Sequence, residues 1–239
     1  MTTVTVAPRF CGPPGCANGG YLAGLLARHA GATVSVRLER PVPVDMPLEL
    51  RAGEQGALEL HAPGQRLARA EPAKLTLEVP PAPDYLAALE ASRRYIGFHG
   101  HFYPGCFVCG PERLRGDGLR IFAGSAGQQV AAPWVPDETV GEADGKVAPE
   151  FMMAALDCPG YFAARSDGVP MLLGQFTAHI DRRVHVDEPC VIVGWRLSVS
   201  GRKYEAATAI YDEDGEPCAY ARAVWIELRG DSGKADAKP

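Results

Sequence analysis

A thirteen-residue stretch occurs twice in the chain, and this internal repeat restricts the possible folds more than any other feature. Leu38–Leu50 and Ile180–Ile192 are separated by 142 residues and share five identical positions. At a separation of 151 residues, Gly64, Ala68 and Ala70 recur as Gly215, Ala219 and Ala221. The second copy therefore holds nine extra residues, which we interpret as a longer hairpin around residues 198–204. Two matches in the same order indicate one structural unit present twice.

Each copy is predicted to consist of one helix followed by several antiparallel strands. Helical periodicity covers about residues 17–29 and 149–164, and Pro149 suits a first helical position. Beyond each helix, apolar and polar residues alternate, as in Val34–Leu38 and 176–180, which is typical of strands packed on one face. A helix against one face of an antiparallel sheet predicts the α+β class.

The repeat divides the chain into four parts. We assign residues 1–83 to the N-terminal repeat, 84–118 to a linker, 119–229 to the C-terminal repeat and 230–239 to a disordered tail. The linker is expected to hold a short helix capped by Asp84, followed by a loop that contains cysteine and histidine. The tail is polar and stands at a chain end, where order is usually lowest.

Composition narrows the classes of partner and location. The formal net charge is −5 and no basic run occurs, so nucleic acid is not an expected partner. No apolar stretch approaches the ~18 residues of a membrane helix, and residues 1–10 lack the layout of a signal peptide. Seven cysteines, without the density of a secreted scaffold, indicate mostly free thiols in a reducing cytoplasm.

Three passages make the chain resemble the tandem (double) hot-dog acyl-CoA thioesterases. Asn18-Gly19-Gly20-Tyr21 is similar to the Gly-Gly helix start of this family, and Ala155-Leu156-Asp157 stands at the place of its helical acid. Residues 176–228, with a hairpin at 212–215, are similar to its strand ladder. The resemblance implies an intramolecular pseudo-dimer that hydrolyses an acyl-CoA or other thioester without a cofactor. It also implies that two chains associate into a homodimer.

The chain departs from the family at two positions. Some tandem members use a glutamine on the last strand to orient water, and Ala223 stands at that place here, with Gln175 or Thr177 as substitutes. The related hydratase branch needs a histidine five residues after the acid, and that residue is Phe162 here. Hydration of an enoyl thioester is therefore disfavoured.

Thioester hydrolysis requires a polarised carbonyl group and an activated water, and the quoted residues could supply both. A helix start offers free N–H groups and a partial positive charge, and Gly19 and Gly20 would let a carbonyl oxygen approach closely. Asp157 is the candidate general base, and Pro159 should kink or break the helix beside it and open space for water. The alternatives are glycines that only form a tight turn and an acid that only satisfies the broken helical turn.

The two copies together predict only one complete site. In paired hot-dog units, the helix start of one unit typically faces the acid of the other. The first helix has the glycines but Ala27 at the matched acid position, whereas the second has the acid but begins with residues 148–150, which include no glycine. We therefore predict one active cleft, built from Gly19, Gly20 and Asp157, and a second that has lost its function.

Five further residues are assigned to substrate binding: Asn18, Tyr21, Tyr161, Gln175 and Thr177. For the two tyrosines, packing in the core is the favoured alternative. Gln175 and Thr177 share one face of a strand, and they could face either the site or solvent.

The linker holds a second group of residues with ligand chemistry. His99, His101, Cys106 and Cys109 offer four groups, which is the number of ligands that structural zinc takes. The two pairs are unusually close and a second CxxC is missing, so a crossover whose cysteines pack inward is the favoured interpretation. We therefore predict no metal, with zinc as the minor alternative. Cys158 is a disfavoured nucleophile, because no His or Asn stands near it in the sequence.

These observations leave three hypotheses from different classes. The first is an enzyme, a tandem hot-dog thioesterase that acts through water activated by Asp157. The second is a hot-dog protein that binds an acyl or aromatic ligand without turnover, which the missing glutamine at Ala223 favours. The third is a zinc-stabilised scaffold.

Overall fold

The computed structural model describes residues 2–165 and 169–228. The segment 230–239, for which we predicted disorder, lies outside the described residues. Among the described residues, no helix has both the length and the hydropathy needed to cross a membrane.

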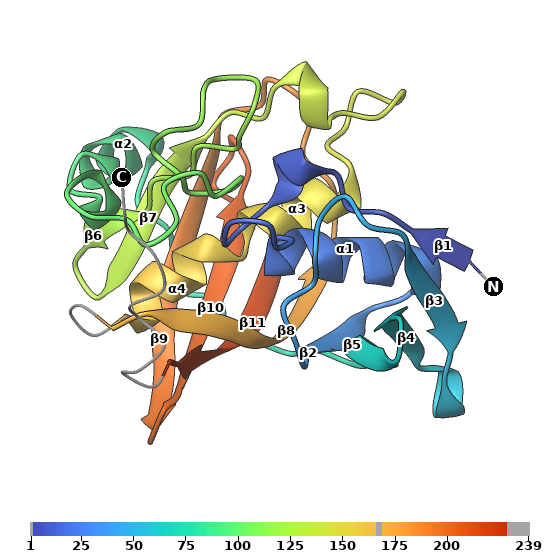
Figure 1. Ribbon diagram of the computed structural model, residues 1–239. Helices are drawn as coiled ribbons and strands as arrows, with labels where there is room; N and C mark the ends of the chain where they lie inside the picture. The colour runs from blue at the N-terminus through green and yellow to red at the C-terminus, as the bar shows by residue number, and fades with distance from the viewer. Residues whose placement is uncertain (1, 166–168, 229–239) are drawn as a thin grey trace.

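The described residues form one antiparallel sheet, in which eleven strands follow the order β1-β3-β4-β5-β2-β8-β11-β10-β9-β7-β6 (Figure 1). The strands of the first half are β1 (Thr2–Val4), β2 (Val34–Leu38), β3 (Leu48–Ala52), β4 (Leu58–Ala62) and β5 (Gln65–Pro72). Those of the second half are β6 (Gly124–Ala126), β7 (Gln129–Trp134), β8 (Met171–Ile180), β9 (Cys190–Ser200), β10 (Lys203–Tyr211) and β11 (Pro217–Glu227). The hairpin of β9 and β10 is the predicted longer one, since the matching strands β3 and β4 have only five residues each.

The helices are short except for the first. The α-helices are α1 (Gly19–Ala30), α2 (Tyr85–Ser92), α3 (Pro149–Ala155) and α4 (Cys158–Ala164), and the 3₁₀ turns are η1 (Pro8–Phe10), η2 (Glu54–Gly56), η3 (Ile96–Phe98) and η4 (Glu138–Val140). Helices α1, α3 and α4 lie across one face of the curved sheet (Figure 1). This arrangement confirms the predicted α+β class.

The two repeats meet at the centre of the sheet and are related by a pseudo-twofold axis. Strand β2 pairs with β8, and Ser35 lies directly opposite Thr177. These two residues are 142 positions apart, which is the separation of the sequence repeat, so each is the equivalent of the other across the axis. Asp45 and Asp187, also 142 apart, both adopt a positive φ, of 58° and 64°. The two repeats therefore share an unusual backbone conformation at this position.

The segments that lead into α1 and α3 are also equivalent, at a separation of 130 residues. Ala17 N donates to Val42 O at 2.7 Å, and Val147 N donates to Val184 O at 2.9 Å. The separation of 130 confirms the predicted equivalence of Ala27 with Asp157.

The second-copy helix is broken where proline predicted a break. Helix α3 ends at Ala155, α4 begins at Cys158, and Asp157 lies between them. Pro159 has no N–H for a hydrogen bond to the carbonyl group four residues earlier, at Ala155. The predicted helix 149–164 is therefore two helices, and the break places an acid next to the α1–α3 contact.

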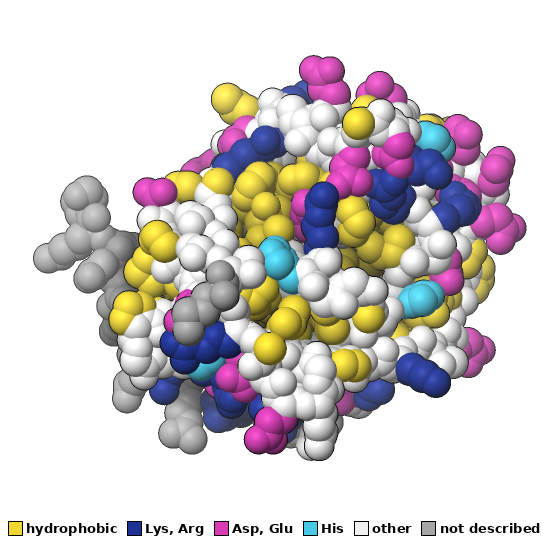
Figure 2. Space-filling model, turned by 90° about the vertical axis from the view of Figure 1, so that its right-hand side faces the viewer, with side chains coloured by type: hydrophobic (Ala, Val, Ile, Leu, Met, Phe, Trp, Pro, Cys, Tyr) yellow, Lys and Arg dark blue, Asp and Glu magenta, His cyan; other side chains and the backbone are white. Residues whose placement is uncertain are grey.

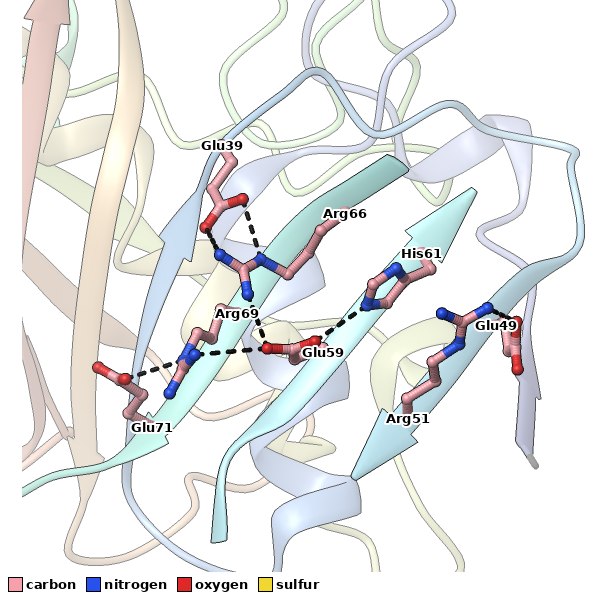
Figure 3. Close-up of polar contacts among 8 residues, drawn as sticks. All are labelled: Glu39, Glu49, Arg51, Glu59, His61, Arg66, Arg69 and Glu71. Carbon is pink, nitrogen blue, oxygen red and sulfur yellow. Dashed lines mark hydrogen bonds and ion pairs between the residues drawn. The ribbon is translucent and has the colours of Figure 1, made fainter. Parts of the chain in front are cut away.

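The outer faces of the two halves differ. In the second half, α2 begins after its predicted cap, Asp84, and covers a small apolar cluster on β7, β9 and β10. In the first half, the outer face carries a ladder of ion pairs, in which Arg66 joins Glu39 to Glu59 (Figure 3). Exposed pairs of this kind contribute only about 0–1 kcal/mol each. On the face shown in Figure 2, basic side chains lie among acidic ones rather than in one patch.

Candidate functional site

The carboxyl group of Asp157 meets the start of helix α1 across the boundary between the repeats. Its Oδ2 accepts hydrogen bonds from Asn18 Nδ2 at 2.8 Å and from the backbone N–H of Gly20 at 3.0 Å. The side chain is buried, with 2% of the residue exposed. The glycine start of the first repeat and the acid of the second therefore converge, as predicted.

Glycine is required at position 20 because the helices approach so closely. A Cβ atom there would lie 2.6 Å from both Asp157 Cβ and Met153 O. Asn18 is the cap residue of α1, and its Oδ1 accepts a hydrogen bond from Tyr21 N at 2.9 Å. This cap turns the Asn18 amide nitrogen toward the carboxylate, so one side chain starts the helix and orients the acid.

The second oxygen of Asp157 differs from the first in its surroundings. Oδ1 is buried and has no hydrogen-bond partner among the described residues. Burial, which disfavours the charged form, raises the pKa of Asp157 to about 7, although the Gly20 N–H and Asn18 oppose this shift. A carboxylate with a pKa near neutrality and a free lone pair is suited to accept a proton from water.

A cavity of about 390 Å³ opens beside this carboxylate. Its walls include Asn18, Gly19, Asp157 and Tyr161, four of the residues that we predicted for the site. Most of the other wall residues are apolar, among them Leu22, Leu38, Phe162, Met171, Leu173 and Trp225. A cavity of this size and character suits an apolar group of a small ligand.

The glycine amides have different roles from the shared role that we predicted. The Gly20 N–H donates to Asp157, so it holds the acid and is not available to a substrate carbonyl group. The N–H of Gly19, the first residue of α1, has no hydrogen-bond partner within the described part of the chain. Gly19 lines the cavity, and its amide is therefore the candidate donor to a substrate oxygen.

Three of the predicted substrate-binding residues lie away from the cavity walls. Tyr21 is buried and stacks on Phe10 with ring centroids 4.2 Å apart, so it belongs to the core. Gln175 and Thr177 both donate to Ser35 Oγ, at 2.8 and 2.9 Å, where β8 pairs with β2. Alternation along β8 sets them on the face opposite buried Phe176.

The linker forms one wall of the cavity, which sequence reasoning missed. Residues 100–103 of the linker lie in this wall, together with Cys106 and Cys109, whose side chains pack inward as the favoured interpretation expected. His99 is exposed and lies outside the wall. The signal for this wall was the concentration of aromatic, cysteine and glycine residues in a segment that we treated as a connection.

The pseudo-equivalent second site is filled by ion pairs. Glu150 stands at the position that matches Gly20, and its Oε1 lies 2.9 Å from Arg28 Nη1. Arg28 also reaches Glu142 at 3.0 Å, and Ala27 stands where the first site has its acid. At the positions that match Gly19 and Asp157, this half has Pro149, which has no N–H, and Ala27, which has no carboxylate.

Comparisons with models of known protein families and with curated protein sequences find no match. Solved structures, however, match almost the whole chain. A candidate thioesterase from Novosphingobium aromaticivorans DSM 12444 has a TM-score of 0.60 at 13% identity, over 95% of this chain and 95% of that one. The tesB protein of Mycobacterium avium subs paratuberculosis has a TM-score of 0.59 at 14% identity, over 90% and 88%. A candidate thioesterase II from Thermobifida fusca YX has a TM-score of 0.57 at 16% identity, over 95% and 92%.

Matches at this level of identity establish the fold. The chain has a tandem hot-dog fold, in which its two repeats form an intramolecular pseudo-dimer. The predicted fold class is confirmed both by the topology and by the near-complete coverage of these three structures.

Proposed function

We propose that this protein is a thioesterase-like hydrolase that cleaves an acyl-CoA or acyl-carrier thioester with water activated by Asp157. The observation that carries the proposal is the convergence of a buried carboxylate, with one unpaired oxygen, and a free helix-start amide at one apolar cavity. The fold shared with structures named as thioesterases supports the same reaction class.

In the proposed mechanism, a water molecule donates a hydrogen bond to Asp157 Oδ1. As its oxygen forms a bond to the thioester carbon, the water proton passes to the carboxylate. The carbonyl oxygen becomes negatively charged and accepts a hydrogen bond from the Gly19 N–H at the positive end of α1. The C–S bond then breaks, and the proton on Asp157 passes to the leaving sulfur, which regenerates the carboxylate and releases a thiol and a carboxylic acid.

The walls of the cavity favour an apolar acyl or aromatic group. Leu22, Leu38 and Trp225 would contact such a group, and burial of apolar area stabilises it by about 25 cal/mol per Å². Arg40 and Arg165 also line the cavity, and they supply the positive charge that the phosphates of CoA require.

A comparison of substrates tests the role of Arg165, whose Nε is buried and has no hydrogen-bond partner among the described residues. Arg165→Gln is expected to raise KM for an acyl-CoA by about 10-fold, the effect of losing a hydrogen bond to a charged group. KM for the matching N-acetylcysteamine thioester should not change, because that substrate has no phosphate. Arg202→Gln, which changes an exposed arginine outside the cavity, is the control. An equal rise for both thioesters would contradict the phosphate role.

A screen of acyl-CoA thioesters with detection of the released thiol tests the proposed reaction. Turnover of any member by the wild type that is absent in Asp157→Asn would support both the reaction and the role of Asp157. Tight binding of the acyl-CoA thioesters without any release of thiol would instead identify the protein as a ligand-binding hot-dog protein. The buried Ala223, at the place of the family's glutamine, is the feature that favours this second function. A cytoplasmic location and association into a homodimer stay predictions.

A further inference from the structure

Three cysteine side chains that are distant in the sequence meet in the wall of the cavity. The sulfur atoms of Cys106, Cys109 and Cys158 all lie within 4.8 Å of one another, and all three residues are buried. Cys106 Sγ and Cys158 Sγ are 3.7 Å apart. That distance is far longer than the roughly 2.05 Å of a disulfide bond, so these are separate thiols.

The turn that carries two of these cysteines is tight and depends on a glycine. Gly110 follows the second cysteine, and its N–H donates to Cys106 O at 2.9 Å. A Cβ at position 110 would lie 2.3 Å from Pro104 O, so only glycine permits this turn. The turn therefore brings the side chains of Cys106 and Cys109 together.

A histidine side chain contacts one of the three sulfurs. His101 Nε2 lies 3.3 Å from Cys109 Sγ, while its Nδ1 accepts a hydrogen bond from Tyr103 N at 2.9 Å. The ring stands beside Tyr95 and Phe162, with centroids 6.1 and 5.9 Å away. These aromatic neighbours keep the imidazole next to the cysteines.

We propose that the sulfurs of Cys106, Cys109 and Cys158 bind zinc, and that a shift of the His101 ring from its contact with Cys109 completes a tetrahedral set of ligands. Ligands at tetrahedral corners, with Zn–S bonds of about 2.3 Å, set two sulfurs roughly 3.8 Å apart, which agrees with the Cys106–Cys158 distance of 3.7 Å. Soft thiolates with one imidazole are a ligand set that zinc prefers. Four protein ligands leave no open position for water or substrate, so this zinc is structural.

The zinc site would connect the linker to the break between helices α3 and α4. Cys158 directly follows Asp157, whereas the other three ligands come from residues 101–109 of the linker. Binding releases the three thiol protons to solvent, and the imidazole must bind through a deprotonated Nε2. His101 then carries its proton on Nδ1 and gives up the hydrogen bond from Tyr103, so we expect it to be the weakest of the four ligands.

Metal analysis of the full chain, expressed in zinc-containing medium and purified without chelator, tests the proposal. About one zinc per chain is expected. Cys158→Ser and Cys106→Ser should each weaken zinc binding at least about 100-fold, and His101→Ala by less than these. Cys190→Ser is the matched control, because Cys190 is an equally buried thiol outside the cluster, and it should keep its zinc. Zinc retained by Cys158→Ser would overturn the proposal.

Cobalt substitution gives a readout that does not depend on activity. The apo protein with Co²⁺ should show the intense visible bands of a tetrahedral cobalt–thiolate centre, and these should weaken in Cys109→Ser and persist in Cys190→Ser. Circular dichroism of each variant would show that it is folded. An apo wild type that binds neither Zn²⁺ nor Co²⁺, or that contains a disulfide between two of the three cysteines when freshly purified, would overturn the site.

Discussion

Asp157→Asn is expected to reduce kcat by about 10²- to 10⁴-fold, the range that a positioned general base contributes. The amide oxygen of asparagine can still accept from Asn18 Nδ2 and the Gly20 N–H, so the packing of α1 on α3 should persist. Its amide nitrogen would replace Oδ1, which is the atom that accepts the water proton in the proposed mechanism. Steady-state kinetics on the best substrate of the acyl-CoA screen measure the loss.

The same substitution should raise the melting temperature at pH 8. At that pH the wild type buries a charged carboxylate that has one unpaired oxygen, and this desolvation is costly. Asparagine keeps the hydrogen bonds and removes the charge, so stability and activity should change in opposite directions.

Glu150→Gln is the matched control, because Glu150 stands at the pseudo-equivalent second site and pairs with Arg28. It should leave kcat within about twofold and lower stability by no more than about 1 kcal/mol, since Arg28 is half exposed. Near-normal turnover in Asp157→Asn would remove Asp157 from the mechanism. A large loss of kcat in Glu150→Gln would show that the second site is active.

The fold was predictable because the repeat includes residues whose identity is restricted by their backbone conformation. Asp45 and Asp187 have a positive φ, which aspartate tolerates better than most residues, and each precedes a matched proline by two positions. The separation of 142 residues therefore marks equivalent backbone rather than chance identity. It also specifies the centre of the sheet, since Ser35 and Thr177 pair across the pseudo-twofold axis.

The site was predictable only in part. The convergence of Gly19 and Asp157 follows from the equivalence of the two repeats, and the helix break follows from Pro159. The division of roles between Gly19 and Gly20 depends on the distance between the backbones of α1 and α3, which packing determines and sequence does not encode locally. The same holds for Cys158, which reaches the linker cysteines because the helix break turns the chain beside them.

Gly20→Ala is expected to reduce kcat by about 10- to 100-fold, the effect of losing one hydrogen bond to a charged group. The new Cβ would lie 2.6 Å from Asp157 Cβ and from Met153 O, so α1 must move away from α3. That movement lengthens the contact of 3.0 Å between the Gly20 N–H and Oδ2, and it frees the carboxylate to turn. Kinetics with the wild-type substrate measure the effect.

Steric overpacking alone must be separated from loss of the hydrogen bond, and Gly24→Ala does this. A Cβ at position 24 would lie 2.4 Å from Glu150 Cα, which is a clash of the same kind, in the same pair of helices, one turn away from the acid. Both variants should lose about 1–3 kcal/mol of unfolding free energy, equivalent to several degrees in melting temperature for a chain of this length. Only Gly20→Ala should lose turnover by 10-fold or more, since of these two glycines only Gly20 donates to Asp157. Equal losses of kcat in the two variants would mean that helix packing, rather than the Gly20 N–H, holds the carboxylate in its working position.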